Sequence, residues 1–124
     1  MADLLVKASP KGGRGVFAAR WFAAGEVIEV CPVIALTAKD AVRLDDTYLY
    51  NYYFGWGPDN KEAAIALGFG SLYNHADPPN AVYRKHPDEG SLSITAVMPI
   101  APGDEVLIRY NFGSEGSSPW FDVR

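Results

Sequence analysis

The stretch GFGSLYNHADPPNA, from Gly68 to Ala81, places an Asn-His pair and two prolines in a predicted loop. The pair could belong to a metal site, to a nucleophile triad or to a plain turn. A metal site needs several converging ligands, and the only other histidine is His86. A triad needs a nucleophile, and the lone cysteine, Cys31, lies in an apolar stretch. We therefore expect no metal. Taken alone, the stretch fits a rigid structural turn better than a loop that recognises a ligand edge.

Two other stretches also combine a turn with a predicted strand. KGGRG, from Lys11 to Gly15, would let the backbone approach a ligand closely. It is neither a P-loop nor a dinucleotide fingerprint, because no Gly-Lys-Ser/Thr and no helix follow it. A tight hairpin turn explains it equally well. GDEVLIRYN, from Gly103 to Asn111, is a turn followed by a buried strand that ends in Tyr110.

Length and composition indicate one small domain over residues 1–124. The chain is 48% hydrophobic, carries a net charge of -4 and has a single cysteine. The charge provides no basic footprint for direct nucleic-acid binding. One cysteine excludes an intrachain disulfide and suits a reducing compartment. Since no membrane-length apolar run and no signal-peptide order occur, we expect a mature, soluble, intracellular protein, cytoplasmic in a bacterium, with nuclear action if the source is viral or eukaryotic.

Short segments bounded by glycine and proline predict a mainly β fold. A long βαβ crossover has no room. Thr37–Leu44 is predicted as a short helix with Thr37 as N-cap, and Lys61–Phe69 as the best helix candidate. The predicted strands and extended segments are Leu4–Lys7, Val16–Arg20, Glu26–Leu36, Asp46–Trp56, Ala81–Lys85, Ser91–Val97 and Val106–Tyr110.

Taken together and in this order, KGGRGVFA, GSLYNHADPPNA and GDEVLIRYN resemble the SET domain of protein-lysine methyltransferases. In that family a GxG turn precedes a VFA strand, an NHxxxPN loop lies mid-chain, and a GEELTxDY strand ends in the catalytic tyrosine. The NHxxxPN pattern is complete here as Asn74-His75 and Pro79-Asn80. The resemblance runs from about Val6 to Trp120 and is strongest to the very small stand-alone SET proteins of large DNA viruses and bacteria.

The resemblance implies a SET-domain fold of the β-clip kind, with several small curled sheets, short helices and a C-terminal pseudoknot. It implies methyl transfer from S-adenosylmethionine to the ε-amine of a lysine in a histone-like or other basic protein. Such a reaction needs a neutral amine, and a free lysine has a pKa near 10.4. A dry aromatic channel disfavours the charged form and orients the amine. The small viral relatives form dimers, so a homodimer is also expected.

The resemblance also assigns roles to individual residues. It implies that Tyr110 and Tyr52 are catalytic and that the tail 113–124 closes the site. The residues expected to bind the cofactor are Lys11, Gly13, Arg14, Gly15, Ser71, Leu72, Asn74, His75 and Trp120. The residues expected to line the substrate channel are Tyr50, Tyr53 and Phe112.

The sequence departs from the family pattern at several positions. Arg109 replaces the usual Asp before the catalytic tyrosine, and Leu107 replaces the usual Thr. Ser71-Leu72-Tyr73 stands where many relatives have Arg-Phe-x. These departures support an alternative function, a non-catalytic SET-like module that binds the cofactor or a peptide. Tyr110 and the complete NHxxxPN pattern favour the enzyme.

Overall fold

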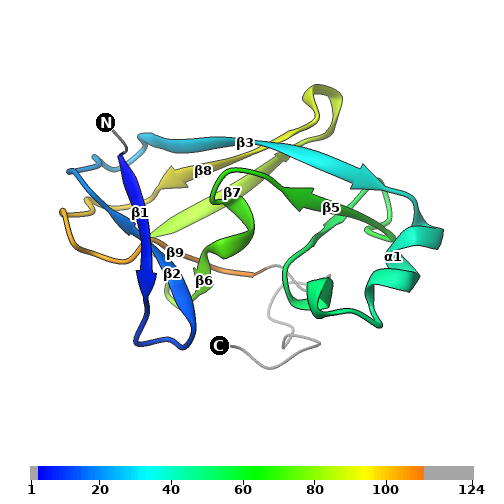
Figure 1. Cartoon of the computed structure of the whole chain (residues 1–124). Helices are drawn as coiled ribbons and strands as arrows, with labels where there is room; N and C mark the ends of the chain where they lie inside the picture. Colours follow the sequence, from blue (N-terminus) through cyan, green and yellow to red (C-terminus); the bar gives the residue numbers. More distant parts are fainter. Residues whose placement is uncertain (1–2, 111–124) are drawn as a thin grey trace.

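The chain folds into two antiparallel-rich sheets, seen in a computed structural model that describes residues 3–110 (Figure 1). β1 (Leu4–Ala8) and β2 (Arg14–Ala18) form a separate two-stranded hairpin. A seven-stranded sheet has the order β4-β5-β3-β8-β7-β9-β6. Its strands are β3 (Val27–Leu36), β4 (Phe54–Trp56), β5 (Glu62–Ala66), β6 (Asn74–His75), β7 (Ala81–His86), β8 (Ser91–Ala96) and β9 (Leu107–Ile108). The expected mainly β class is confirmed.

The long strand β3 gives the larger sheet its curl. Its first part, Val27–Pro32, pairs with β8, and its last part, Val33–Leu36, pairs with β5. The register with β8 shifts between Val27 and Glu29. Such bulges increase the local twist and bend a strand. In Figure 1, β3 therefore crosses the molecule and passes from one set of partners to the other.

The last described strand, β9, lies between two strands that are joined to each other by a loop. β9 pairs in parallel with β6 and, through Ile108, with Ala81 of β7. The connecting loop holds it at both ends, because the Ala76 N–H donates to the Ile108 carbonyl at 3.0 Å and the Asn80 N–H to the Leu107 carbonyl at 3.1 Å. This pairing brings the Asn-His segment against the strand that leads to Tyr110, as expected for the C-terminal pseudoknot.

Helical segments are short. The predicted N-cap is confirmed: α1 (Ala38–Leu44) begins after Thr37, whose Oγ1 accepts a hydrogen bond from the Asp40 N–H at 3.2 Å. The prediction of an extended segment over Asp46–Trp56 is wrong for its first part, which forms the 3₁₀ helix η1 (Tyr48–Asn51) capped by Thr47. Two more 3₁₀ turns are η2 (Gly70–Leu72) and η3 (Pro87–Glu89).

The predicted helix over Lys61–Phe69 is also wrong, because this segment contains strand β5 followed by a turn. Its alanines favour a helix locally, but so short a helix is marginal without tertiary support. β5 instead pairs on one side with β3 and on the other with β4. Ala63 and Ala64 are completely buried there. Tertiary packing and ladder hydrogen bonds therefore override the local preference.

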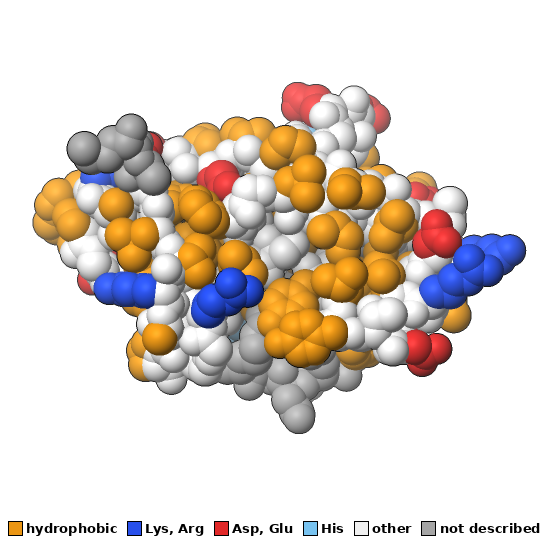
Figure 2. Space-filling model, viewed as in Figure 1, with side chains coloured by type: hydrophobic (Ala, Val, Ile, Leu, Met, Phe, Trp, Pro, Cys, Tyr) orange, Lys and Arg blue, Asp and Glu red, His pale blue; other side chains and the backbone are white. Residues whose placement is uncertain are grey.

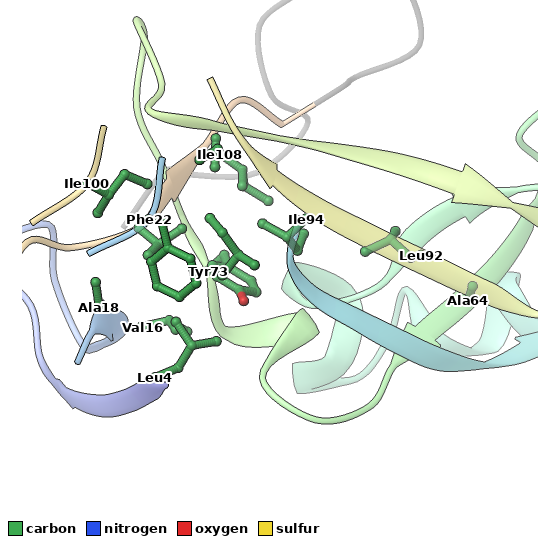
Figure 3. Packing of buried hydrophobic residues seen from close by; sticks show 14 of the residues in the cluster. Leu4, Val16, Ala18, Phe22, Ala64, Tyr73, Leu92, Ile94, Ile100 and Ile108 are labelled. Carbon is green, nitrogen blue, oxygen red and sulfur yellow. The ribbon is translucent and has the colours of Figure 1, made fainter. Parts of the chain in front are cut away.

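The core lies where the hairpin packs against the larger sheet. Figure 3 shows Phe22 and Tyr73 packed together with Leu4, Val16 and Ile94. Phe22, Val16 and Ile94 are fully buried, and Tyr73 is 1% exposed. Since Tyr73 immediately precedes the Asn-His pair, the core fixes the place where that pair begins.

Candidate cofactor site

A small pocket lies beside the turn that joins β1 and β2. Its volume is about 140 Å³. The residues that line it are Gly13, Arg14, Tyr48, Tyr52 and Leu72. They come from the hairpin turn, from η1 with its C-cap, and from η2. The fold thus brings the glycine-rich turn, one of the expected catalytic tyrosines and the segment before the Asn-His pair to one place.

Asn74 is fully buried and contacts Arg14, one of the residues that line this pocket. Its Nδ2 donates to the Arg14 carbonyl oxygen at 2.9 Å and to Oε2 of Glu105 at 2.9 Å. Its Oδ1 has no hydrogen-bond partner, and no other buried side-chain polar atom among the described side chains shares that condition. A buried acceptor without a donor costs about 1–3 kcal/mol. This oxygen is therefore suited to a donor that a ligand brings.

The missing side chain of Gly15 makes room for this arrangement. A Cβ at Gly15 would collide with the Glu105 carboxylate and would lie 2.9 Å from Asn74 Nδ2. Ser9 holds the same carboxylate, since its Oγ is 2.7 and 2.9 Å from the two oxygens. Gly13 serves a different purpose, because its φ of +61° is a left-handed conformation that glycine adopts at little cost.

Asn80, the last residue of the NHxxxPN pattern, acts within the protein. Its Nδ2 donates to the Glu105 carbonyl oxygen at 2.8 Å, and its Oδ1 accepts from the Leu107 N–H at 2.8 Å. The Val106 N–H between them donates to the Val16 carbonyl of β2 at 2.8 Å. The loop, the final strand and the hairpin are thereby joined around Glu105.

Tyr110 is held beside the Asn-His pair by two hydrogen bonds, one from its side-chain hydroxyl and one from its backbone N–H. Its hydroxyl donates to the Tyr73 carbonyl oxygen at 2.8 Å, and its backbone N–H donates to His75 Nδ1 at 3.0 Å. The two rings of His75 and Tyr110 lie 5.1 Å apart. The backbone at the start of the NHxxxPN loop and the histidine ring thus set the position of the tyrosine.

Tyr73 is fixed in turn by Glu29. The Tyr73 hydroxyl donates to Glu29 Oε1 at 2.7 Å, and the Phe69 N–H donates to Glu29 Oε2 at 3.0 Å. Burial, with the neighbouring Glu29 charge, raises the pKa of Tyr73 well above its usual range, so the hydroxyl remains a donor. Glu29 therefore anchors the segment whose carbonyl receives the Tyr110 hydroxyl.

His75 is held in the neutral form by its surroundings. Burial is the main cause that lowers its pKa below the ordinary value of 6.5. The positive charges of Arg109 and Lys11 lower this pKa further, and Asp77 opposes them. A neutral ring agrees with the geometry, because Nδ1 must be unprotonated to accept from the Tyr110 N–H.

We expect His75 to titrate below 6.5 in the folded protein, and the Tyr110 amide to follow the same transition. The unfolded chain binds this proton more readily than the folded protein. The contribution of neutral His75 to stability is therefore complete above the pKa of the unfolded state, and it is lost as the pH falls through the lower pKa of the folded state. Nuclear magnetic resonance of the imidazole and of the Tyr110 amide measures both. His86→Gln serves as control for the assignment. A His75 titration at or above 6.5 would contradict this expectation.

Four other predicted site residues, Lys11, Ser71, Tyr50 and Tyr53, do not line the pocket. Lys11 is exposed in the hairpin turn, and its N–H donates to Ser9 Oγ at 3.0 Å. Ser71 donates from Oγ to the Ala66 carbonyl at 2.9 Å, which ties η2 to the end of β5. Tyr50 and Tyr53 pack edge to face, with their ring centroids 6.3 Å apart.

Tyr53 makes a further contact outside the pocket, since its hydroxyl donates to Asp45 Oδ1 at 2.6 Å. Burial raises the pKa of Tyr53, and the hydrogen bond to Asp45 adds to the effect. The two predicted residues Phe112 and Trp120, with the tail 113–124, lie outside the described residues. The substrate-channel roles stay predictions.

Three residues of the site were not found from the sequence. Tyr48 lines the pocket, and its hydroxyl accepts from Tyr52 at 3.2 Å. Glu105 and Asn80 support Asn74 and the final strand. The cluster DTYLYNYYF contains four tyrosines, and residue type alone does not select among them. For Glu105 the only signal was its place in the GDEVLIRYN stretch.

Two of the departures from the family pattern, Leu107 and Arg109, lie in or directly after strand β9. Leu107 pairs with Asn74 across β6 and β9 and is half-buried. Arg109 is exposed, and its charge acts on His75.

Within residues 3–110, no helix is long and apolar enough to cross a membrane. In the same range, no His, Cys, Asp and Glu side chains gather as a set of three metal ligands.

Comparisons with known proteins agree on one family. The sequence profile of the SET domain matches residues 13–111. A Schizosaccharomyces pombe protein named histone-lysine N-methyltransferase, H3 lysine-37 specific, is 28% identical over 122 residues, which are 98% of this chain and 78% of that protein.

Solved structures share the fold. A Plasmodium falciparum protein assigned as a histone methyltransferase has 30% identity and a TM-score of 0.72, over 90% of this chain and 95% of that one. A chain of the Chaetomium thermophilum Polycomb Repressive Complex 2 has a TM-score of 0.76 at 18% identity, over 91% of this chain and 16% of its own. At that identity the second likeness concerns the fold alone.

Proposed function

The chain belongs to the SET domain family as a protein-lysine methyltransferase, and we propose that it transfers a methyl group from S-adenosylmethionine to a lysine ε-amine of a histone-like or other basic protein. The observation that carries this proposal is the buried Asn74 with its unpartnered Oδ1. The Asn74 amide is hydrogen bonded to the Arg14 carbonyl, and Asn74 follows Tyr73, whose carbonyl receives the Tyr110 hydroxyl. A ligand with a positively charged donor fits the Asn74 oxygen.

The chain's own residues fit S-adenosylmethionine. The unpartnered Asn74 Oδ1 would accept from its α-ammonium group, and Lys11 and Arg14, both exposed at the turn, would attract its carboxylate. The backbone of Asn74 and His75 would hold the adenine. When bound, S-adenosylmethionine supplies an electrophilic sulfonium methyl group for in-line displacement by the amine.

Tyr110 and the pocket tyrosines would align the incoming amine. The Tyr110 hydroxyl donates to a backbone carbonyl, and because a hydroxyl oxygen is an acceptor as well as a donor, it would receive a hydrogen bond from the amine. Tyr52 and Tyr48 would place aromatic rings at the edge of the site. A lysine amine that becomes buried between such rings would lose its proton more readily, because burial disfavours the charged form. Tyr110 would thus hold geometry and need not act as a strong base.

The substrate we favour is a lysine-bearing basic tail, with histone H3 as the first candidate. The S. pombe relative is named for lysine 37 of histone H3. A net charge of -4 would favour the approach of a basic tail, modestly and in a salt-dependent way. The non-catalytic binding module remains the second function, favoured by Arg109 in place of the usual Asp.

The test is transfer of labelled methyl groups to core histones and to a lysate of the source organism. We expect label on a lysine, located by mass spectrometry, and its loss from a histone peptide in which that lysine is replaced by arginine. Binding of S-adenosylhomocysteine by calorimetry is measured in parallel. Binding without labelling of any protein would favour the binding module. Folded protein that neither binds nor labels would overturn the proposal.

The expected homodimer stays a prediction. Figure 2 shows hydrophobic side chains spread over the viewed face of the molecule. The most exposed large ones among the described residues are Tyr48, Val42, Trp21 and Val30, at 79%, 68%, 64% and 60%. They come from separate elements, and no second chain is needed to build the pocket described above.

A further inference from the structure

We propose that Glu105 is a positioning residue that sets the orientation of the Asn74 side-chain amide. With Glu105 in place, Asn74 keeps its carbonyl oxygen available for the α-ammonium group of the cofactor. The inference rests on the proposed function, because it concerns how this chain receives S-adenosylmethionine. It assigns a role to Glu105, which is not among the tyrosines proposed to align the substrate amine.

The geometry admits one orientation of the amide. Asn74 Nδ2 lies 2.9 Å from the Glu105 carboxylate and 2.9 Å from the Arg14 carbonyl oxygen. A carbonyl and an ionised carboxylate can only accept hydrogen bonds, so the two Nδ2 hydrogens satisfy both. A rotated amide would turn its oxygen toward two acceptors and would leave its two donors unpaired in a fully buried place.

Glu105 supplies the stronger of the two restraints. A hydrogen bond to an ionised group is roughly twice as strong as one between neutral groups. Ser9 Oγ donates to the carboxylate, and Asn80 Nδ2 donates to the Glu105 backbone carbonyl at 2.8 Å. Gly15 leaves no side chain between the carboxylate and the amide. Glu105 is thus itself fixed before any ligand arrives.

The side-chain oxygen of Asn74 is therefore oriented as an acceptor before the ligand binds. Oδ1 of Asn74 is buried without a partner. Because the protein holds the amide in this orientation, a donor on the ligand meets no reorientation cost. A positively charged donor gains most. The affinity for a ligand with an ammonium group should therefore depend on Glu105, and the affinity for the same ligand without it should not.

The test compares S-adenosylhomocysteine with its desamino analogue, which keeps the adenosine, the thioether and the carboxylate. We expect wild-type protein to bind S-adenosylhomocysteine about tenfold to a hundredfold more tightly than the analogue, the size of one charge-assisted hydrogen bond. In Glu105→Met, which is of similar length but accepts no hydrogen bond, the ratio should fall to within about threefold of unity. Glu105→Gln keeps an acceptor and should restore most of the ratio.

A thermodynamic cycle separates positioning from general support. In an Asn74→Ala background, Glu105→Met should leave the ratio of the two affinities unchanged, because Glu105 acts through Asn74. Ser9→Ala, which removes a neighbour of Glu105 and leaves the carboxylate in place, is the matched control. Equal losses for both ligands in Glu105→Met, with the wild-type ratio kept, would overturn the proposal. Wild-type protein that binds neither ligand would instead overturn the proposed function.

A measurement on the wild-type protein keeps the inference testable if Glu105→Met does not fold. The two Asn74 side-chain amide protons should exchange slowly with solvent in the ligand-free protein, since both are hydrogen bonded. Nuclear magnetic resonance of the labelled side-chain amide reports this exchange. Fast exchange that slows only when S-adenosylhomocysteine is added would show that the ligand, and not Glu105, orders the amide.

Discussion

Tyr110→Phe is expected to lower the rate of methyl transfer by about 100-fold or more, which is the size of effect that misplacement of a reacting group by a small distance produces. The change removes the hydroxyl that donates to the Tyr73 carbonyl at 2.8 Å. It keeps the ring that packs at 5.1 Å from His75. The alignment of the amine is therefore lost, while the wall of the site is retained.

The stability of this variant should change little, since one neutral hydrogen bond contributes about 0.5–1.5 kcal/mol. Affinity for S-adenosylhomocysteine should be close to that of the wild type, because Asn74 and the glycine turn are untouched. Label transfer, calorimetry and thermal unfolding measure the three quantities. Tyr83→Phe is the matched control, as Tyr83 is half-buried and packs against Phe54 at the edge of the core. Full activity of Tyr110→Phe would refute the catalytic role.

Gly15→Ala is expected to destabilise the protein by about 1–3 kcal/mol and to weaken S-adenosylhomocysteine binding about tenfold. The added methyl group would collide with the Glu105 carboxylate and would lie 2.9 Å from Asn74 Nδ2. The Glu105 carboxylate and the Asn74 amide must then move. Denaturant unfolding and calorimetry measure the two effects.

Gly13→Ala separates crowding from backbone strain. Gly13 has a φ of +61°, but a Cβ there would meet nothing within 4 Å. Its replacement should lower stability by about 1 kcal/mol, the usual cost of a left-handed alanine. Glu105→Ala in the Gly15→Ala background should recover part of the lost stability, because it removes the nearest obstacle. Equal behaviour of the two glycine variants, with no recovery, would show that the close packing at Gly15 has no consequence.

Motifs with strict local requirements could be predicted from the sequence. Threonine is a preferred residue at the N-cap of a helix, and Thr37 occupies that position. Glycine between two short strands predicts a tight turn, as Gly13 shows. The order of the three motifs indicated the family and, through it, Asn74, His75 and Tyr110. These predictions depend on contacts between near neighbours in the chain, or on a pattern that the family shares.

Segments whose structure depends on distant neighbours could not be predicted in this way. Lys61–Phe69 is alanine-rich and reads locally as a helix, but β3 and β4 offer it backbone partners on both sides. Among the four tyrosines of DTYLYNYYF, only their place in the lining of the pocket distinguishes Tyr48 and Tyr52 from the others. Because these residues are all tyrosines, only their positions in the tertiary structure show which of them line the pocket.

The sequence by itself determined the family, the mainly β class and the residues that carry the methyl-transfer proposal. Turns depend on neighbouring residues, and the order of the motifs can be read along the chain. Only the tertiary structure decided which groups support them. Asn74 and Glu105 are far apart in the chain, and they meet because β9 lies between β6 and β7. The physical reason is the hydrogen-bond demand of a buried amide: its donors require acceptors from distant segments, and its remaining acceptor is left for a ligand.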